Sequence, residues 1–341
     1  MDIQRLKEHI LEGDYIVQIL ESIHCHHIRK HNGSTPYITC ANPDGDNQSA
    51  ILIYLNEYLT TLDYTRNIGN KKTDLFSLVE FFRDCSFFES VKFVCDCIDL
   101  DYYHDFDADL PESIKLSKMI LEMQNDPSTV EDENVPIKPI SEKILSYYRH
   151  TVNDMFQADG IDYETQWLFE IGYDDETNRI TIPIRDEIGT LVGVKGRLFS
   201  QNVVNQNKYI YLEPTPRNKI LYGLNFTYHS IKEKGVCYVG EAEKSCMQLW
   251  SMGIFNSVAI GGKKISSIQI EKLTRLCVDI VFLFDKDVEK KELEQIAERF
   301  VKEINVYAII DTENILDEKE SPTDNPKKLK ILLDKCKYKL N

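Results

Sequence analysis

The sequence has no long hydrophobic run. None of its apolar stretches approaches the roughly 20 residues that a membrane-spanning helix needs. The opening residues, MDIQRLKEHILEGDYIVQIL, carry acidic side chains early and lack an uninterrupted apolar core, so they do not resemble a secretory signal. We therefore expect a protein that neither enters nor crosses a membrane.

Positive charge is also scarce. The chain has 40 Lys and Arg residues against 56 Asp and Glu residues, a formal net charge of −16. This balance argues against a protein that binds nucleic acid over its whole surface. A local basic patch remains compatible with it, because the electrostatic field depends on how charge is distributed as well as on its total.

The cysteines do not suggest a disulfide framework. There are nine, an odd number, and they are scattered over 341 residues. Such usage is typical of reduced thiols in a cytoplasmic protein. The sequence also contains no internal repeat and no low-complexity tract.

What is present is the composition of an ordinary globular protein, 42% hydrophobic and 28% charged, with a length sufficient for two or three domains. Changes in composition and residue pattern along the chain predict five segments. They are an α+β N-terminal domain, an acidic linker, a basic α+β segment, an α/β domain and a C-terminal helix or tail. Their predicted ranges are 1–105, 106–140, 141–235, 236–325 and 326–341.

The segment 179–199, RITIPIRDEIGTLVGVKGRLF, alternates β-branched and polar residues around the turn DEIG, which predicts a β-hairpin. It opens a basic region. Residues 179–235 contain nine Lys or Arg and four Asp or Glu, a balance of +5 within a chain of −16. That contrast favours phosphate binding, since Lys and Arg supply most non-specific affinity for nucleic acid. The alternative for any one of these cations is a solvated charge on a hairpin.

From Val236 onward, strand-like and helix-like segments alternate. The strand-like segments are VCYVG, NSVAI, DIVFLF and NVYAII. Alternation at this spacing predicts a small parallel sheet with helices on both faces.

Acidic residues follow three of these predicted strands. Glu241 follows the first, Asp285 and Asp287 follow the third, and Asp311 with Asp317 follows the fourth. In open α/β sheets the chemistry gathers at the carboxyl ends of the strands. Carboxylates at one edge repel each other unless cations lie between them, and their oxygens suit Mg²⁺ or Mn²⁺. The alternative is that each acid caps the following helix; their joint occurrence favours metal ions in paired-metal phosphoryl chemistry.

These residues carry a family resemblance. The segments YVGEAEKSCMQLWSMGIFNSVAIGG and DIVFLFDKD resemble the Toprim domain of bacterial DnaG-type primases. Glu241, Gly253, Gly262, Asp285 and Asp287 match the acidic and glycine positions of that domain in order and spacing. The resemblance implies a Toprim α/β fold in which Glu241, Asp285 and Asp287 are catalytic and hold the metal.

The sequence departs from the family in two places. An aspartate is common four residues after the glutamate, where this chain has Ser245, so one metal position is weakened. The segment DEKESPTDN resembles the family's acidic stretch with proline, but Ser321 stands where an aspartate is usual. Asp317 is our candidate metal ligand there, and Glu320 and Asp324 are its alternatives.

The resemblance extends upstream, to the hairpin and to KYIYLEP and NKILYGL, which look like the basic half of the primase core. It implies that the cations of this half bind template and nucleotide phosphates. The residues carried over are Arg197, Lys208 and Lys219, with Arg179, Arg185 and Lys195 as auxiliaries. Lys263, beside the glycine turn of the Toprim-like segment, is a further predicted nucleotide- or template-binding residue.

The N-terminal segment resembles a primase zinc-binding domain that has lost its ligands. Cys40 matches the first ligand, Pro43 stands where a histidine is expected, and LTTLDYTRN contains no second cysteine pair. A zinc ribbon needs four ligands, so we do not expect structural zinc, even with Cys25 and His27 in the segment HCHHIRKH. Cys85, Cys95 and Cys97 lie in an apolar segment with a helical pattern and are expected to be buried thiols. Tyr64 and Arg66 are expected to stack on single-stranded bases.

The sequence therefore predicts a compact DnaG-like primase of phage or mobile-element type. Its expected substrates are ribonucleoside triphosphates and a single-stranded DNA template, its cofactor is Mg or Mn, and the resemblance allows a replicative helicase as partner. The chain ends soon after the Toprim-like segment, so no helicase-binding module is expected. Two alternatives stay open: a Toprim nuclease that uses water as nucleophile, and a catalytically decayed accessory protein that binds single-stranded nucleic acid.

Overall fold

A computed structural model describes most of the chain as two compact units, Met1–Leu121 and Glu122–Asn341. The described residues are 1–66, 68, 73–106, 108, 137–200, 207–262, 264–286, 288–318 and 320–341. Within them, no helix combines the length and the apolar character needed to cross a bilayer. All nine cysteines are free thiols.

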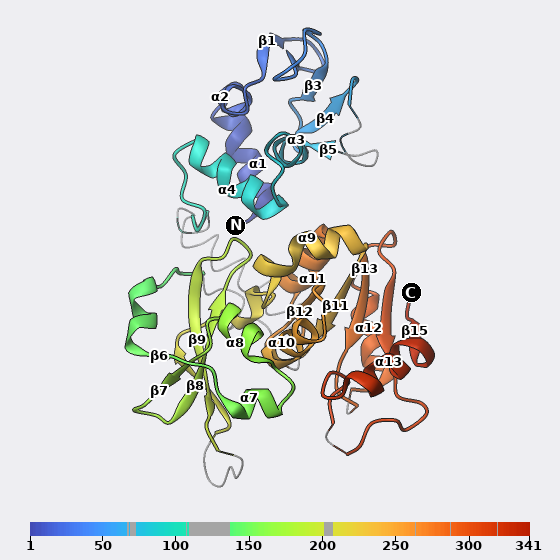
Figure 1. Cartoon of the computed structure of the whole chain (residues 1–341). Coiled ribbons are helices and arrows are strands. Elements are labelled where there is room, and N and C mark those ends of the chain that lie inside the picture. Colours follow the sequence, from blue (N-terminus) through green and yellow to red (C-terminus); the bar gives the residue numbers. More distant parts are fainter. Residues whose placement is uncertain are drawn as a thin grey trace. The chain divides into compact units, whose positions relative to one another are not determined.

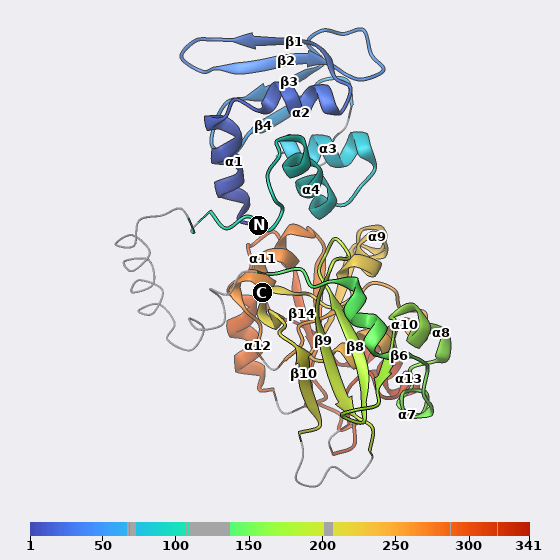
Figure 2. The same cartoon turned by 90° about the vertical axis from the view of Figure 1, so that its left-hand side faces the viewer.

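The first unit is a five-stranded antiparallel sheet with helices on one side of it (Figure 2). The strand order is β1-β2-β3-β4-β5. The elements are α1 (Ile3–Glu12), α2 (Ile16–Ser22), β1 (His26–His31), β2 (Tyr37–Ala41), β3 (Ile51–Tyr54), β4 (Thr60–Asp63), β5 (Thr73–Asp74), α3 (Leu75–Arg83) and α4 (Phe87–Cys97).

Local sequence explains where the helices of this unit begin. The Asp74 carboxylate accepts the backbone N–H of Ser77 at the start of α3. At the start of α4, Ser86 and Glu89 form a reciprocal capping box, which satisfies backbone donors that a helix N-terminus leaves without partners. Helices and strands are thus both present in this unit, as the predicted α+β character requires.

The second unit contains two sheets (Figure 1). The first is antiparallel, with strand order β10-β9-β8-β7-β6. Its strands are β6 (Arg149–His150), β7 (Gly172–Asp174), β8 (Arg179–Arg185), β9 (Leu191–Leu198) and β10 (Tyr209–Glu213), and the accompanying helices are η1 (Glu142–Tyr147), α7 (Asp154–Ala158) and α8 (Tyr163–Leu168). β8 and β9 form the hairpin that the sequence predicts.

The second sheet has the order β12-β11-β13-β14-β15. β11, β12, β13 and β14 run parallel, as predicted, and β15 pairs antiparallel with β14. β15 was not expected, because Lys337–Lys339 lies in the segment predicted to be a helix or tail. The elements are η2 (Arg217–Lys219), α9 (Leu224–Lys234), β11 (Val236–Gly240), α10 (Glu243–Ser251), β12 (Ser257–Ala259), α11 (Ser267–Arg275), β13 (Asp279–Leu283), α12 (Lys290–Ala297), β14 (Val306–Ile309), α13 (Pro326–Lys335) and β15 (Lys337–Lys339).

Apolar residues of β13 face both sides of the parallel sheet. Val281 and Leu283 belong to one buried cluster with Leu332 of α13. Phe282 points to the opposite face, where its ring centroid lies 6.3 Å from that of Phe300. A strand buried on both faces needs a nearly continuous apolar run, which is what DIVFLF supplies.

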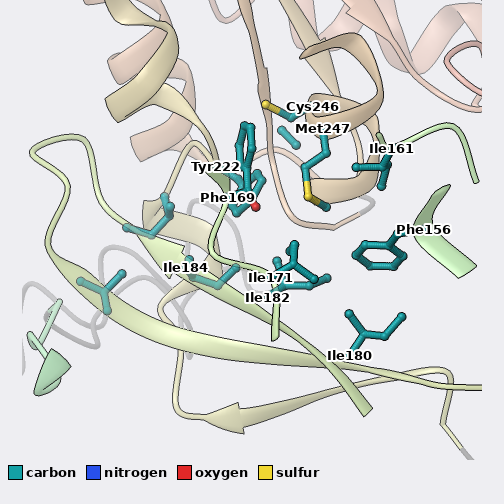
Figure 3. Packing of buried hydrophobic residues seen from close by; sticks show 13 residues of the cluster. Phe156, Ile161, Phe169, Ile171, Ile180, Ile182, Ile184, Tyr222, Cys246 and Met247 are labelled. Atoms are coloured by element: carbon teal, nitrogen blue, oxygen red, sulfur yellow. The ribbon is translucent and has the colours of Figure 1, made fainter. Parts of the chain in front are cut away.

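A shared core joins the two sheets of the second unit (Figure 3). Ile180 and Ile182, on one face of β8, belong to the same buried cluster as Cys246 and Met247 of α10. Because α10 lies between β11 and β12 in the chain, this packing fixes the basic hairpin relative to the parallel sheet. Truncating a buried isoleucine of this kind to alanine costs about 2–5 kcal/mol.

Candidate active site

The order of the parallel strands places a topological switch point between β11 and β13. The chain leaves β11 toward β12 on one side, whereas it leaves β13 toward β14 on the other. In open α/β sheets, ligands bind outside the carboxyl ends of the strands where the connections diverge in this way. Gly240 and Leu283, at the ends of β11 and β13, are paired in register. The residues that follow them therefore emerge side by side (Figure 1).

Two of the predicted catalytic residues meet at this point. Glu241 follows β11, and its Oε1 accepts the backbone N–H of Asp285 at 2.7 Å. Asp285 is exposed, so its carboxylate can reach a ligand without the cost of burying a charge. Both side chains offer hard oxygen donors of the type that Mg²⁺ and Mn²⁺ prefer. Asp287, the third predicted residue, lies outside the described residues.

The loop that carries Glu241 is held by close packing. A β-carbon on Gly240 would lie 2.6 Å from Cβ of Ser245, so this position requires glycine. Ser245, which stands where the family commonly has an aspartate, is buried beneath the loop. The backbone N–H of Gly262 donates to the Glu241 carbonyl at 3.1 Å, which brings the predicted glycine turn to the same place.

The remaining acidic residues are engaged elsewhere. Asp311 is buried and accepts the N–H groups of Ile315 and Leu316 at 2.8 and 2.9 Å. Burial opposes its charge, yet these hydrogen bonds and nearby Lys286 lower the pKa of Asp311. Asp317 is exposed and pairs with Lys328 at 2.7 Å. Over the described part of the chain, no three His, Cys, Asp or Glu side chains gather as a metal site.

Lys195, a predicted phosphate-binding residue, forms a buried ion pair. Its Nζ lies 2.7 Å from Oε2 of Glu243, in the first turn of α10. The ammonium also lies 5.0 Å from the ring centroid of Tyr209. The structure thus places Lys195 next to the Glu241 loop, with its charge neutralised by the protein itself.

Three other cations gather on the same side of the unit. Arg197 lies 3.5 Å from Asp159, and Lys244 lies 4.0 Å from the same carboxylate. Partial burial and then the charges of Arg197 and Lys244 lower the pKa of Lys208. Arg197 Nε and Asp159 Oδ2 are buried without a hydrogen-bond partner. Asp159 and Asp324, which accepts Lys244 at 2.8 Å, are two carboxylates against the three cations, and the remaining positive charge is suited to bind a phosphate.

Arg179 and Arg185, by contrast, are committed to the fold. The buried Arg179 guanidinium donates to three backbone carbonyls, on Gly196, Asn207 and Lys208. Arg185 uses its N–H groups on Glu142, Glu170 and the Gly189 carbonyl.

Burial opposes the charge of Arg185, but the two carboxylates raise its pKa. In this arrangement both guanidinium groups donate their hydrogen bonds to protein acceptors rather than to a ligand. Lys219 lies half-buried in η2, and Lys263 lies outside the described residues.

Several residues that build this face were not predicted from the sequence. They are Asp159, Glu243, Lys244 and Gln248. Gln248 donates to the Asp159 carbonyl and to Asp324 at 2.6 and 2.9 Å, and it thereby joins segments far apart in the chain. Glu243 and Lys244 follow Glu241 closely in the sequence, and this closeness could have identified them as residues of the site.

In the first unit, the position that the resemblance matches to a zinc ligand is part of the core. Cys40 is fully buried in β2, and a hydrogen bond with Cys25, together with burial, raises the pKa of its thiol. Cys95 is buried as expected, whereas Cys85 and Cys97 are partly exposed. Tyr64 is exposed. Arg66 pairs with Asp44 and lies 5.6 Å from the ring centroid of Phe82.

Comparison with known proteins gives an uncharacterized prophage-derived relative and relatives named DNA primase. No protein-family model matches the chain. An SPbeta prophage-derived uncharacterized protein of Bacillus subtilis strain 168, YorJ, is 29% identical over 226 residues, covering 57% of this chain and 59% of that protein. A DNA primase of Chlamydia pneumoniae is 36% identical over 114 residues, or 32% of this chain and 19% of that protein. A DNA primase of Legionella pneumophila is 31% identical over 123 residues, or 35% and 21%.

The chain thus spans less than two thirds of YorJ and about a fifth of each primase. Among solved structures, the zinc-binding and RNA polymerase domains of Aquifex aeolicus primase align over 98% of this chain and 86% of that one, at 18% identity and a TM-score of 0.49. A DnaG primase catalytic domain bound to single-stranded DNA aligns over 58% and 78%, at 17% identity and a TM-score of 0.48. The sequence relatives confirm the predicted resemblance to DnaG-type primases.

Proposed function

We propose that this chain is a primase that joins ribonucleotides into short RNA primers on a single-stranded DNA template. One observation carries the proposal: Glu241 and Asp285 meet at the ends of adjacent parallel strands, 2.7 Å apart from carboxylate oxygen to backbone nitrogen. The similarity to DNA primases in sequence supports the same reaction. The phage or mobile-element origin is supported by the prophage-derived relative.

In this proposal the Toprim-like carboxylates hold a divalent cation. Glu241, Asp285 and Asp287 would bind Mg²⁺ or Mn²⁺, which when bound stabilises the negative charge that develops on the transferred phosphoryl group. The backbone N–H of Asp285 orients the Glu241 carboxylate through the 2.7 Å hydrogen bond. The exposed position of Asp285 leaves room for a nucleotide beside it.

The basic side of the unit would bind the anionic substrates. Partial burial and then the neighbouring charges of Arg197 and Lys244 lower the pKa of Lys208. An incoming phosphate would relieve the repulsion among these three cations. Lys219 and Lys263 remain predicted contributors. Lys195 would act indirectly, through its ion pair with Glu243. A replicative helicase is a proposed partner on the same grounds of resemblance.

The test is a primer-synthesis assay with labelled ribonucleotides on random single-stranded DNA, run beside a nuclease assay on the same template. We expect short RNA products that depend on Mg²⁺ or Mn²⁺ and on all four nucleotides, with no loss of template. Template cleavage without synthesis would identify a Toprim nuclease instead. Binding without either reaction would identify an accessory protein.

A further inference from the structure

A lysine occupies the space between two carboxylates that follow β14. Lys328, in α13, places its Nζ 2.7 Å from Asp317 Oδ2 and 2.5 Å from Glu320 Oε2. The same Glu320 oxygen accepts the backbone N–H of Asp317 at 2.8 Å. The ammonium, the two carboxylates and the connecting loop thus form one closed arrangement, which we name the Lys328 clamp.

Two of the three side chains of the clamp are partly buried. The side chains of Glu320 and Lys328 are only 16% and 24% exposed, although that of Asp317 is 85% exposed. Lys328 lies in the first turn of α13, which Asn325 caps and Pro326 begins, so its position is fixed by the helix. Hydrogen bonds between an ammonium and a carboxylate are among the strongest in proteins.

The same loop contains a second pairing of this kind. Asp324, seven residues after Asp317, accepts Lys244 at 2.8 Å and Gln248 at 2.9 Å. Lys244 is only 25% exposed and its partner 27%. Each of the acids Asp317, Glu320 and Asp324 therefore already has a cation supplied by the protein.

Asp285 differs from these acids. It is exposed, and no lysine or arginine in the described ranges forms an ion pair with it. A divalent cation needs carboxylate oxygens that are not already neutralised, and an ammonium in the same place repels it. The acids near α13 are thus paired with lysine ammonium groups, whereas Asp285 is available to a divalent cation.

We propose that the ammonium of Lys328 takes the place of a divalent cation at Asp317 and Glu320, so that divalent metal binds at the carboxylates that follow β11 and β13 and not at these two acids. The inference rests on the proposed function for the location of that metal. It reassigns Asp317 from metal ligand to partner of Lys328. The inference is also consistent with Ser245, which stands where the family commonly has an aspartate. A site that binds one divalent cation needs fewer carboxylate ligands than a site that binds two.

The first experiment counts bound Mn²⁺ in the full chain, by the electron paramagnetic resonance signal of free Mn²⁺ during titration. We expect one bound ion in the wild type, with the same number and less than a twofold change in Kd for Asp317→Asn. Loss of a bound ion, or a Kd weakened by about tenfold or more, the scale for disturbing a metal site, would make Asp317 a ligand and overturn the inference.

The second experiment removes the internal cation. In Lys328→Met the two carboxylates repel each other, so we expect a lower Tm without divalent ions and a larger rise in Tm on adding millimolar Mn²⁺ than the wild type shows. Lys327→Met is the matched control, because Lys327 is the exposed neighbour on the same helix, and it should behave as wild type. If Lys328→Met also behaves as wild type, the clamp does not hold an internal cation.

A third variant separates this inference from the proposed function. Asp285→Asn should abolish or weaken the single Mn²⁺ site that Asp317→Asn leaves intact. If Asp285→Asn binds Mn²⁺ normally, the proposed metal site is wrong. The Lys328 clamp is judged independently, by Asp317→Asn and Lys328→Met.

Discussion

Lys195 Nζ lies 2.7 Å from Glu243 Oε2, with the two side chains only 10% and 4% exposed. The pair connects β9 of the antiparallel sheet to the start of α10, two residues after Glu241. It therefore fixes the basic hairpin against the loop that carries a predicted catalytic carboxylate. Such a pair is costly to bury but more costly to break.

Lys195→Met leaves the Glu243 carboxylate buried without its cation. We expect the free energy of unfolding to fall by about 3–5 kcal/mol, the cost of breaking a buried ion pair. Urea unfolding followed by tryptophan fluorescence measures it in the second unit, because Trp167 and Trp250, the two tryptophans of the chain, both lie there. The double variant Lys195→Met/Glu243→Leu should recover most of the loss. A stable single variant that binds nucleotide poorly would instead make Lys195 a direct ligand.

Arg185 and Lys208 should separate structural cations from binding cations. Arg185→Met removes the partner of Glu142 and Glu170 and should lower the stability of the second unit without changing the salt dependence of DNA binding. Lys208→Ala should leave stability nearly unchanged. It should lower the slope of log K against log salt by about one, as expected for one lost phosphate contact. An unchanged slope would show that Lys208 is a solvated surface charge that does not contact a DNA phosphate.

Glu187 should make stability depend on pH. Burial opposes its charge, but Lys272, at 2.6 Å, lowers its pKa below the ordinary 4.5. Above pH 4.5 the carboxylate stabilises the folded state, and this contribution is lost as the pH falls from 4.5 through the lower folded pKa. Glu187→Gln should therefore show a shallower loss of stability in acid. Glu271→Gln, which affects only the exposed pair with Arg275, should keep the wild-type profile.

Asp285→Asn should separate metal binding from helix capping. The variant keeps the backbone N–H that Glu241 accepts, so it should fold as well as the wild type without metal. It should lose the rise in Tm that Mn²⁺ gives, and primer synthesis should fall by about 100-fold or more, the scale for losing an electrostatic stabiliser. An active variant with a normal Mn²⁺ response would contradict the metal role, because a capping residue tolerates asparagine.

The first unit should fold without zinc. A zinc ribbon needs four ligands, and Cys40 lies buried beside Cys25 instead. Elemental analysis should find well below one zinc per chain, and a chelator should not change the Tm. Stoichiometric zinc that disappears in Cys40→Ser would show that the prediction is wrong.

The sequence predicted those parts of the fold that depend on neighbouring residues. The apolar runs at β11 and β13 and the hairpin of β8 and β9 are where the sequence placed them. Glu241 and Asp285 were predicted to lie at one edge because parallel strands bring their carboxyl ends together, and a 2.7 Å hydrogen bond joins the Glu241 carboxylate to the Asp285 backbone N–H. Local periodicity is sufficient for such elements, since it depends on which faces of a strand are buried.

Tertiary structure alone determined which charges neutralise each other and where the last strand lies. The sequence gives no sign that Lys195 pairs with Glu243, 48 residues away, or that Arg185 is engaged by two glutamates while Lys208 stays exposed. β15, Lys337–Lys339, is a strand because the edge of β14 offers unpaired backbone groups, although its residues are mostly charged. An ion pair depends on the distance between two charged groups in space. For residues far apart in the sequence, that distance is determined only when the two sheets pack on α10.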